Sequence, residues 1–203
     1  MRSLLFVAAI ILLSCGHGST DKKKETPRTD TIRKTTDTAK NVAPETPATY
    51  EAPDEAIVNN SLVTSNGSQW HVLNDKEAHW MKDAFDYFIV PKRKGNPGYP
   101  YIAKGDFDGD GKADTAAVVT DKSKTNYQLA ILMGTGKTLF WKEDIADDAA
   151  ISMVPKSDIE GMDGEKTKKV KMKADGINVE YFEKAAFVLY WDRSSFKRIQ
   201  TAD

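Results

Sequence analysis

The sequence predicts an α+β domain, built mostly of antiparallel β-sheet in a meander of hairpins, with one N-terminal amphipathic helix. From residue 99 onward, short runs rich in β-branched and aromatic side chains alternate with turns, and no second long helix separates them. Parallel strands need a crossover of a dozen or more residues, so the short gaps favour antiparallel pairing. Before residue 99, one segment repeats apolar residues at helical spacing.

The first residues are predicted to form an export signal. Arg2 precedes an apolar run at 4–13, which is too short to span a bilayer stably and is followed by Ser14 and Cys15. Residues 1–14 are therefore predicted to be a signal peptide. Cys15 is the single cysteine of the 203-residue chain, so it has no partner for an internal disulfide.

The segment from Leu12 to Cys15 resembles the lipobox of bacterial lipoproteins. The resemblance implies cleavage before Cys15, lipidation of its thiol and anchoring to a membrane of the bacterial cell envelope. Two acyl attachments make such anchoring stable. Gly16 after the cysteine favours the outer membrane, with the protein facing the periplasm or the surface. The alternative is an ordinary signal peptide with a chance cysteine near its end.

Residues 15–60 are predicted to be a disordered tether. They are rich in Thr, Pro, Lys and Glu, and their few apolar residues follow no period. Such a segment cannot bury enough surface to offset the entropy of ordering it. A partner-binding tail is the alternative interpretation. The folded domain is then expected over residues 61–203, and the formal net charge of −1 gives no indication of nucleic acid binding.

The predicted helix begins at Asn74, a favourable N-cap, with Glu77 placed as in a capping box. Apolar residues then recur at helical spacing, and Pro91 with the Gly/Pro-rich loop after it is expected to end the helix. The predicted apolar face consists of Ala78, Met81, Ala84, Phe85 and Phe88.

Nine strands are predicted after this helix. Their spans are 99–105, 113–121, 126–134, 137–144, 149–155, 168–175, 177–183, 185–192 and 195–202. The short connection between the last two predicts a C-terminal hairpin. Most aromatic residues are expected in the core, although an exposed patch able to bind a glycan or a protein is an alternative.

The stretch GDFDGDGKAD carries the main chemical signal. Carboxylates stand at loop positions 1, 3, 5 and 9, with a glycine at position 6 that permits the sharp positive-φ turn around an ion. Oxygen ligands without nearby His or Cys favour Ca²⁺ over zinc or copper. An EF-hand does not fit, because Ala117 stands where a bidentate Glu is required and a β-branched strand follows instead of a helix.

The same stretch with its following strand, GDFDGDGKADTAAVV, resembles the calcium loops of FG-GAP and VCBS-type repeats, as does LAILMGTGKTLF after it. The resemblance implies a single-unit domain, since one loop cannot build a propeller. It also implies a Ca²⁺ cofactor held by Asp106, Asp108, Asp110 and Asp114, with the backbone carbonyl of Lys112. The alternative is a solvated Asp/Gly turn that binds no ion.

Other chemistry is not indicated. MGTGKT imitates the end of a P-loop, but Ile131 stands where the first glycine is required and no helix follows, so no nucleotide is expected. No catalytic residues emerge, because the chain has no HExxH, Cys/His set or GxSxG elbow. The expected function is a non-enzymatic binding or assembly module of the envelope, with an envelope protein or glycan as partner. The alternative is an envelope hydrolase that uses calcium structurally.

Overall fold

A computed structural model describes residues 54–66 and 69–202, which form mostly antiparallel β-sheet with few helices, as predicted. The predicted signal peptide, Cys15 and residues 15–53 lie outside the described residues. The helical elements are α1 (Glu55–Asn66), α2 (Lys82–Ala84), the π-helical η1 (Phe85–Ile89) and α3 (Val90–Arg93). The strands are β1 (Trp70–Val72), β2 (Ile102–Gly105), β3 (Asp114–Asp121), β4 (Tyr127–Leu132), β5 (Thr138–Phe140), β6 (Ala149–Val154), β7 (Asp158–Asp163), β8 (Lys166–Lys171), β9 (Gly176–Tyr181), β10 (Ala185–Asp192) and β11 (Ser195–Ala202).

Strand β3 is the centre of the first sheet, whose order is β1-β3-β4-β5 with β2 also beside β3. β4 pairs with one edge of β3. β1 and β2 share the other edge, with Val72 opposite Val119 and Ile102 opposite Ala117. Because four consecutive residues of β3, from Ala116 to Val119, are fully buried, this strand is covered on both faces.

The second sheet has the order β6-β9-β10-β11-β7-β8. The predicted C-terminal hairpin is confirmed, since Asp192 pairs with Ser195 across a two-residue turn in which Arg193 has φ +62°. The first sheet also contains a hairpin, because the glycines after β4 form the turn that leads back into β5.

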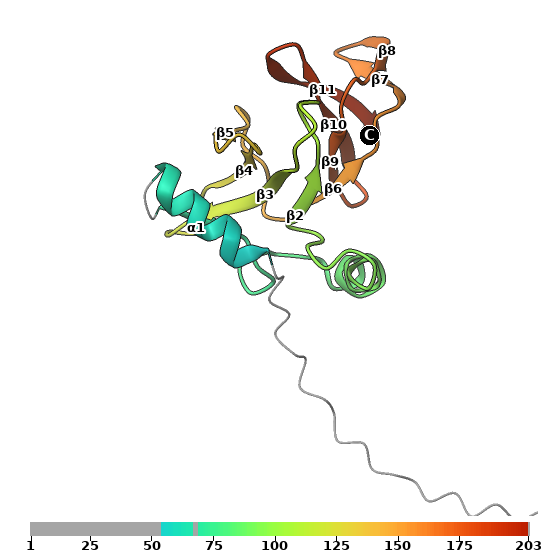
Figure 1. Ribbon diagram of the computed structural model, residues 1–203. Coiled ribbons are helices and arrows are strands. Elements are labelled where there is room, and N and C mark those ends of the chain that lie inside the picture. Colours follow the sequence, from blue (N-terminus) through green and yellow to red (C-terminus); the bar gives the residue numbers. More distant parts are fainter. Residues whose placement is uncertain (1–53, 67–68, 203) are drawn as a thin grey trace, which may run out of the picture. The chain divides into compact units, whose positions relative to one another are not determined.

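The two sheets and α1 share one hydrophobic core. Val58 and Leu62 of α1 are buried together with Ile131 of β4, Ile151 of β6 and Leu189 of β10. The sheets are also joined at their edges, where the backbone N–H of Ile151 donates to the carbonyl of Pro100 over 2.8 Å. In the view of Figure 1, α1 crosses in front of the first sheet, whose core it shares, and the coil of the helical segment at 82–93 lies beyond β2. Among the described residues, no helix is long and apolar enough to cross a membrane.

Because α1 is present, the folded part begins nearer the N-terminus than the predicted boundary at residue 61. It begins at Glu55, so the predicted tether over 15–60 overlaps its first half. The composition of this segment concealed the helix, because only Val58 and Leu62 enter the core while Ile57 and Val63 remain exposed. Packing against the sheet supplies the stability that local propensity does not.

The helix predicted from Asn74 begins later than expected. Asn74 and Glu77 do not form the predicted capping box, because their bond joins the two side chains, with Asn74 Nδ2 donating to Glu77 Oε2 over 2.7 Å. A turn follows, and the helical segment begins at Lys82. Glu77 also contacts His71 and Lys124, and these tertiary contacts hold the turn. Of the predicted apolar face, Met81 and Phe88 are about half exposed.

Pro91 does not end the helical segment. It occupies the first turn of α3, which continues directly from η1 to Arg93. The wider π-helical turn has Val90 N–H donating to Phe85 O, and the proline needs no acceptor because it has no N–H.

All nine predicted strands are present, and two further strands, β1 and β7, were missed. β7 has the sequence DIEGMD, which lacks the alternation of a half-buried strand. Gly161 explains its position, since a Cβ there would lie 2.1 Å from the carbonyl oxygen of Gln200 on β11. Only glycine permits this close approach.

A polar network connects Arg93 and the turn before the helical segment to Tyr101, the residue before β2. Trp80 Nε1 donates to the Tyr101 hydroxyl over 2.8 Å, and that hydroxyl donates to Asp75 Oδ1 over 3.0 Å. Arg93 binds both oxygens of Asp75, at 2.7 and 2.5 Å. Burial acts to raise the pKa of Asp75, but its bonds to Arg93 and Tyr101 outweigh this and lower the pKa.

We expect Tyr101→Phe to destabilise the domain by about 1–3 kcal/mol, because Trp80 loses its acceptor and Asp75 loses a donor. Denaturant unfolding measures the change. Tyr127→Phe is the matched control, since the one bond of its hydroxyl among the described residues goes to the exposed Lys124 carbonyl. Equal losses in the two variants would contradict a structural role for the network.

Candidate metal centre

The aspartate loop is the connection of a β-hairpin. β2 ends at Gly105 and β3 begins at Asp114, and these two residues face each other in the antiparallel register. The loop between them is thus closed at its base by the sheet. Gly109 and Gly111 have φ values of +79° and +83°, in the left-handed region that favours glycine. The predicted sequence of loop and then strand is confirmed.

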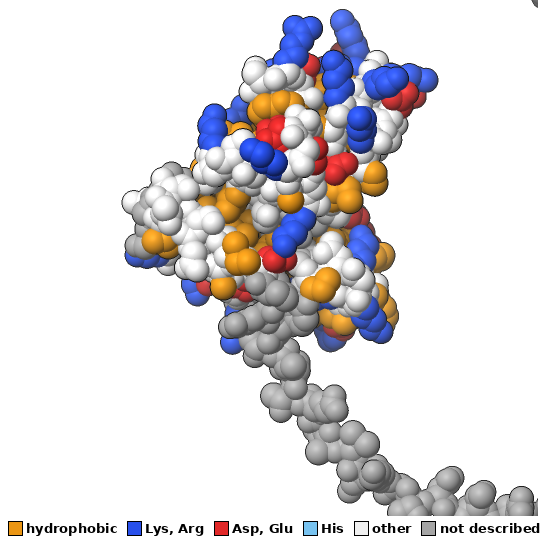
Figure 2. Space-filling model, viewed as in Figure 1, with side chains coloured by type: hydrophobic (Ala, Val, Ile, Leu, Met, Phe, Trp, Pro, Cys, Tyr) orange, Lys and Arg blue, Asp and Glu red, His pale blue; other side chains and the backbone are white. Residues whose placement is uncertain are grey.

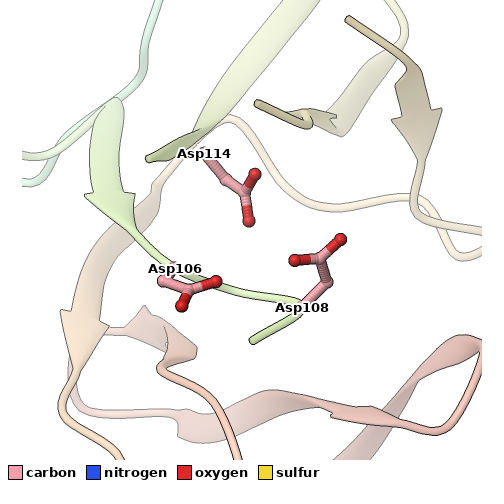
Figure 3. Close-up of side chains that lie close together, drawn as sticks. All are labelled: Asp106, Asp108 and Asp114. Atoms are coloured by element: carbon pink, nitrogen blue, oxygen red, sulfur yellow. The ribbon is translucent and has the colours of Figure 1, made fainter. Parts of the chain in front are cut away.

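Three of the four predicted acidic ligands come together in this loop. One carboxylate oxygen from each of Asp106, Asp108 and Asp114 lies within 4.8 Å of the other two. Figure 3 shows the three carboxylates turned toward one another. Asp106 and Asp108 are partly exposed and Asp114 is buried, so the group opens to solvent from one side. We call these three side chains the aspartate trio.

Backbone hydrogen bonds fix the orientation of Asp106 at the start of the loop. Its two carboxylate oxygens accept N–H groups from Gly109 and Gly111, at 2.8 and 3.0 Å. Asp108 Oδ1 accepts the N–H of Asp110 over 3.0 Å. The loop therefore wraps around its own carboxylates, and the two positive-φ glycines provide the turns that this wrapping needs.

Asp114 closes the loop from the strand side. Its oxygens accept the N–H of Phe107 over 2.8 Å and that of Gly134 over 2.7 Å. Gly134 lies so close that a Cβ there would be 2.7 Å from Cβ of Lys112. Phe107 is fully buried, which anchors the loop in the core. The turn after β4 thus helps to position the predicted ligand.

Asp114 is the one fully buried charged residue among those that the structure describes. Burial raises the pKa of its carboxyl, and the nearby charge of Asp108 also raises it, while the bonds from Gly134 and Phe107 act in the opposite direction. A like-charged neighbour and the loss of water both disfavour the carboxylate, and a cation between the two would favour it.

The Asp110 side chain is not part of the trio. Asp110 Oδ1 accepts the N–H of Lys112 over 2.8 Å, and its other oxygen is 3.9 Å from Nζ of Lys112. Asp110 is therefore not among the carboxylates that converge. The Lys112 side chain is exposed, as the ligand pattern predicts when only the backbone carbonyl faces the ion.

Asp175 is a residue of this centre that sequence reasoning missed. It precedes β9, and its Oδ2 accepts the N–H of Asp106 while its Oδ1 accepts the N–H of Lys156, both over 3.1 Å. Its own N–H donates to the carbonyl of Asp106 over 3.0 Å. The carboxylate thus ties the loop of the first sheet to the second sheet. A lone aspartate in the run KKVKMKAD carries no sequence signal for this role.

The aspartate trio is a candidate site for a hard divalent cation, because its three oxygens are close enough to share one ion. Oxygens that coordinate one calcium ion at about 2.4 Å lie at most about 4.8 Å apart, which is the limit that the trio meets. Carboxylate oxygens suit Ca²⁺ or Mg²⁺ and not softer metals. Each oxygen that accepts one backbone N–H keeps a second lone pair, so the bonds of Asp106 and Asp114 are compatible with coordination.

Comparison of the chain with protein-family models, curated proteins and solved structures found no match in any of the three.

We expect Asp175→Ala to lower the free energy of unfolding by about 1–3 kcal/mol, because two backbone N–H groups lose their acceptor. Denaturant unfolding without added metal measures this. Asp158→Ala, an exposed carboxylate on β7, is the matched control and is expected to change stability by less than about 0.5 kcal/mol. If both variants unfold like the unmodified chain, Asp175 does not hold the two sheets together.

Proposed function

We propose that this chain is an exported lipoprotein whose single FG-GAP/VCBS-like domain, of the α+β class, holds one calcium ion in the β2–β3 loop. The observation that carries the proposal is the convergence of Asp106, Asp108 and Asp114 in a hairpin loop. Asp110 and the Lys112 carbonyl are further candidates from the ligand pattern. Calcium would neutralise charges that repel one another, and extracellular calcium is concentrated enough to fill even a weak site.

The ion would act structurally, by holding the loop closed between two strands. Because Asp106 is bonded to Asp175, an ordered loop would also hold the segment that leads into β9. An ion that binds only the folded state stabilises it in proportion to its occupancy. Calcium would thus couple the stability of the domain to its location outside the cytoplasm.

A binding or assembly module at the bacterial cell envelope is the role that we propose for the domain. Support comes from the position of the aspartate trio, because the trio lines neither of two hollows found among the described residues. One of these hollows lies along β11, and the other, of about 250 Å³, lies beside Phe88 and Phe182. A calcium ion held by the trio would stabilise the domain without lining either hollow.

Calcium at 100 times its dissociation constant is expected to stabilise the chain by about 2.7 kcal/mol, which corresponds to roughly 5–10 °C in melting temperature for a domain of this size. Calorimetric titration after treatment with chelator measures the binding, and thermal unfolding measures the shift. No heat of binding together with an unchanged melting temperature would exclude the site.

Variants test the ligand set within the same experiment. Asp108→Ala is expected to abolish the shift, and Asp110→Ala to weaken binding if the pattern assigns it correctly. Lys112→Ala, whose exposed side chain is not a proposed ligand, is the matched control and should bind calcium normally. Equal loss in all three variants would mean that the assigned ligands are wrong.

The lipid anchor is tested separately. Cys15→Ala is expected to release the protein from the membrane fraction, because it removes the thiol that would carry the lipid. Cell fractionation followed by immunoblotting measures the distribution, with Ser14→Ala as the control that retains the thiol. Membrane retention of Cys15→Ala would contradict lipidation at this residue.

A further inference from the structure

Strand β11 has an outer edge that is paired at a single position. Its inner edge pairs with β10 from Ser195 to Ala202. On its outer side, β7 reaches it only where Met162 lies opposite Gln200. β7 ends at Asp163, and Gly164, with φ +63°, turns the chain into β8. The part of β11 from Ser195 to Arg198 therefore has no neighbouring strand on this side among the described residues.

The register shows which backbone groups face this edge. Asp192 and Ser195 close a two-residue turn, so they form a hydrogen-bonded pair, and Lys197 and Ile199 also bond to β10 in the alternating pattern of an antiparallel ladder. The N–H and C=O groups of Phe196 and Arg198 consequently point to the outer edge. Within the described part of the chain, no strand pairs with Phe196 or Arg198 on that side.

A hollow of about 890 Å³ runs along this edge. Ser195 and Lys197 lie on one face of β11, and Phe196 and Arg198 on the other, yet all four line the same hollow. The hollow must therefore extend around the free edge of the strand. Its other walls come from the segment after β5 (141–143), the end of β7 and Lys168 of β8. This volume lies within the range of ordinary ligand sites.

We propose that this edge binds an extended, acidic peptide segment of another protein, which adds a strand to the second sheet beside β11. Strand addition satisfies backbone donors and acceptors on both chains, while the walls of the hollow provide contacts for alternate side chains. The proposed surface is distinct from the calcium site, since the aspartate trio does not line the hollow.

Charge favours an acidic strand. The hollow is lined by four cationic side chains, Lys142, Lys168, Lys197 and Arg198, and by three acidic ones, Glu143, Asp163 and Asp192. Most of these are already engaged, because Arg198 bonds to Glu143 over 2.9 Å and Lys168 to Asp163 over 2.7 Å. Lys197 and Asp192 are exposed and neither has an ion-pair partner among the described residues, so the lining of the hollow has an excess of one positive charge (four cationic and three acidic side chains). Figure 2 shows Lys and Arg side chains gathered at the end of the domain where the β7–β8 and β10–β11 hairpins project.

The same charges disfavour a second copy of this chain as the occupant. Antiparallel pairing of two β11 edges centred on Lys197 would place the two lysines directly opposite each other, and like charges in that position destabilise a sheet. Lysine on an exposed edge is also a common barrier to pairing between identical strands. An acidic side chain on an added strand would instead be attracted to Lys197.

Hydrogen exchange measured by NMR on the full chain tests the proposal. The probe is an acetylated, amidated peptide of sequence Thr-Glu-Val-Glu-Val-Thr. At saturating peptide, the amides of Phe196 and Arg198 are expected to exchange at least about tenfold more slowly, because they donate to the added strand. The amides of Lys197 and Ile199 already bond to β10 and serve as the internal control, with no expected change.

Two matched peptides and one variant complete the test. Lysine in place of glutamate, or N-methylation of the amides that would join the ladder, should abolish protection, and Lys197→Glu should weaken binding of the acidic probe about tenfold. Absence of protection at both amides would overturn the proposal, as would equal binding of the N-methylated or lysine peptide. Protection that rises with protein concentration without peptide would overturn it in favour of a second copy.

Discussion

The fold depends on the pairing of β3 along both of its edges. Four consecutive residues of this strand, from Ala116 to Val119, are fully buried, so their backbone polar groups have no water to bond. β4 provides partners along one edge, and β1 and β2 provide them along the other. Every element that completes this pairing also contributes side chains to the core. The helix α1 then covers part of the sheet with Val58 and Leu62.

Asp114, the first residue of β3, links the paired strand to the aspartate loop. Asp114 is buried where β3 meets the aspartate loop, and it accepts backbone N–H groups from Phe107 and from Gly134 in the next turn. Because the N–H of Asp106 also donates to Asp175, which precedes β9, the loop is hydrogen-bonded to residues of both halves of the fold. The strands around the loop thus hold the three carboxylates close together. The carboxylates repel one another, and the proposed cation would offset this repulsion.

Strands β3 and β11 differ in how completely their two edges are paired. β3 is paired on both sides, whereas β11 has an outer edge that β7 meets at one position. Gly161 permits this contact, and the turn at Gly164 then directs β8 away. Lys197 beside the free edge limits pairing between identical strands and leaves room for a strand of opposite charge. A folded domain with one strand edge open to an added strand is compatible with the proposed role as a binding module.

The sequence by itself determined the β-rich fold and the position of the loop. Period-2 runs and turn residues located nine strands, and the spacing of aspartates and glycines located a loop that continues into a strand. These features depend on neighbours along the chain, which a sequence displays directly. The predicted resemblance to calcium-loop repeats and the lipid anchor remain proposals.

Tertiary structure decided the features that depend on residues distant in sequence. It set the start of the helical segment at Lys82, because Glu77 contacts His71 and Lys124. It brought Asp175 to the loop and formed β7 by a close approach that only Gly161 permits. Each of these three features results from a contact between residues that are distant in the sequence. The residues next to each position along the chain do not indicate such a contact.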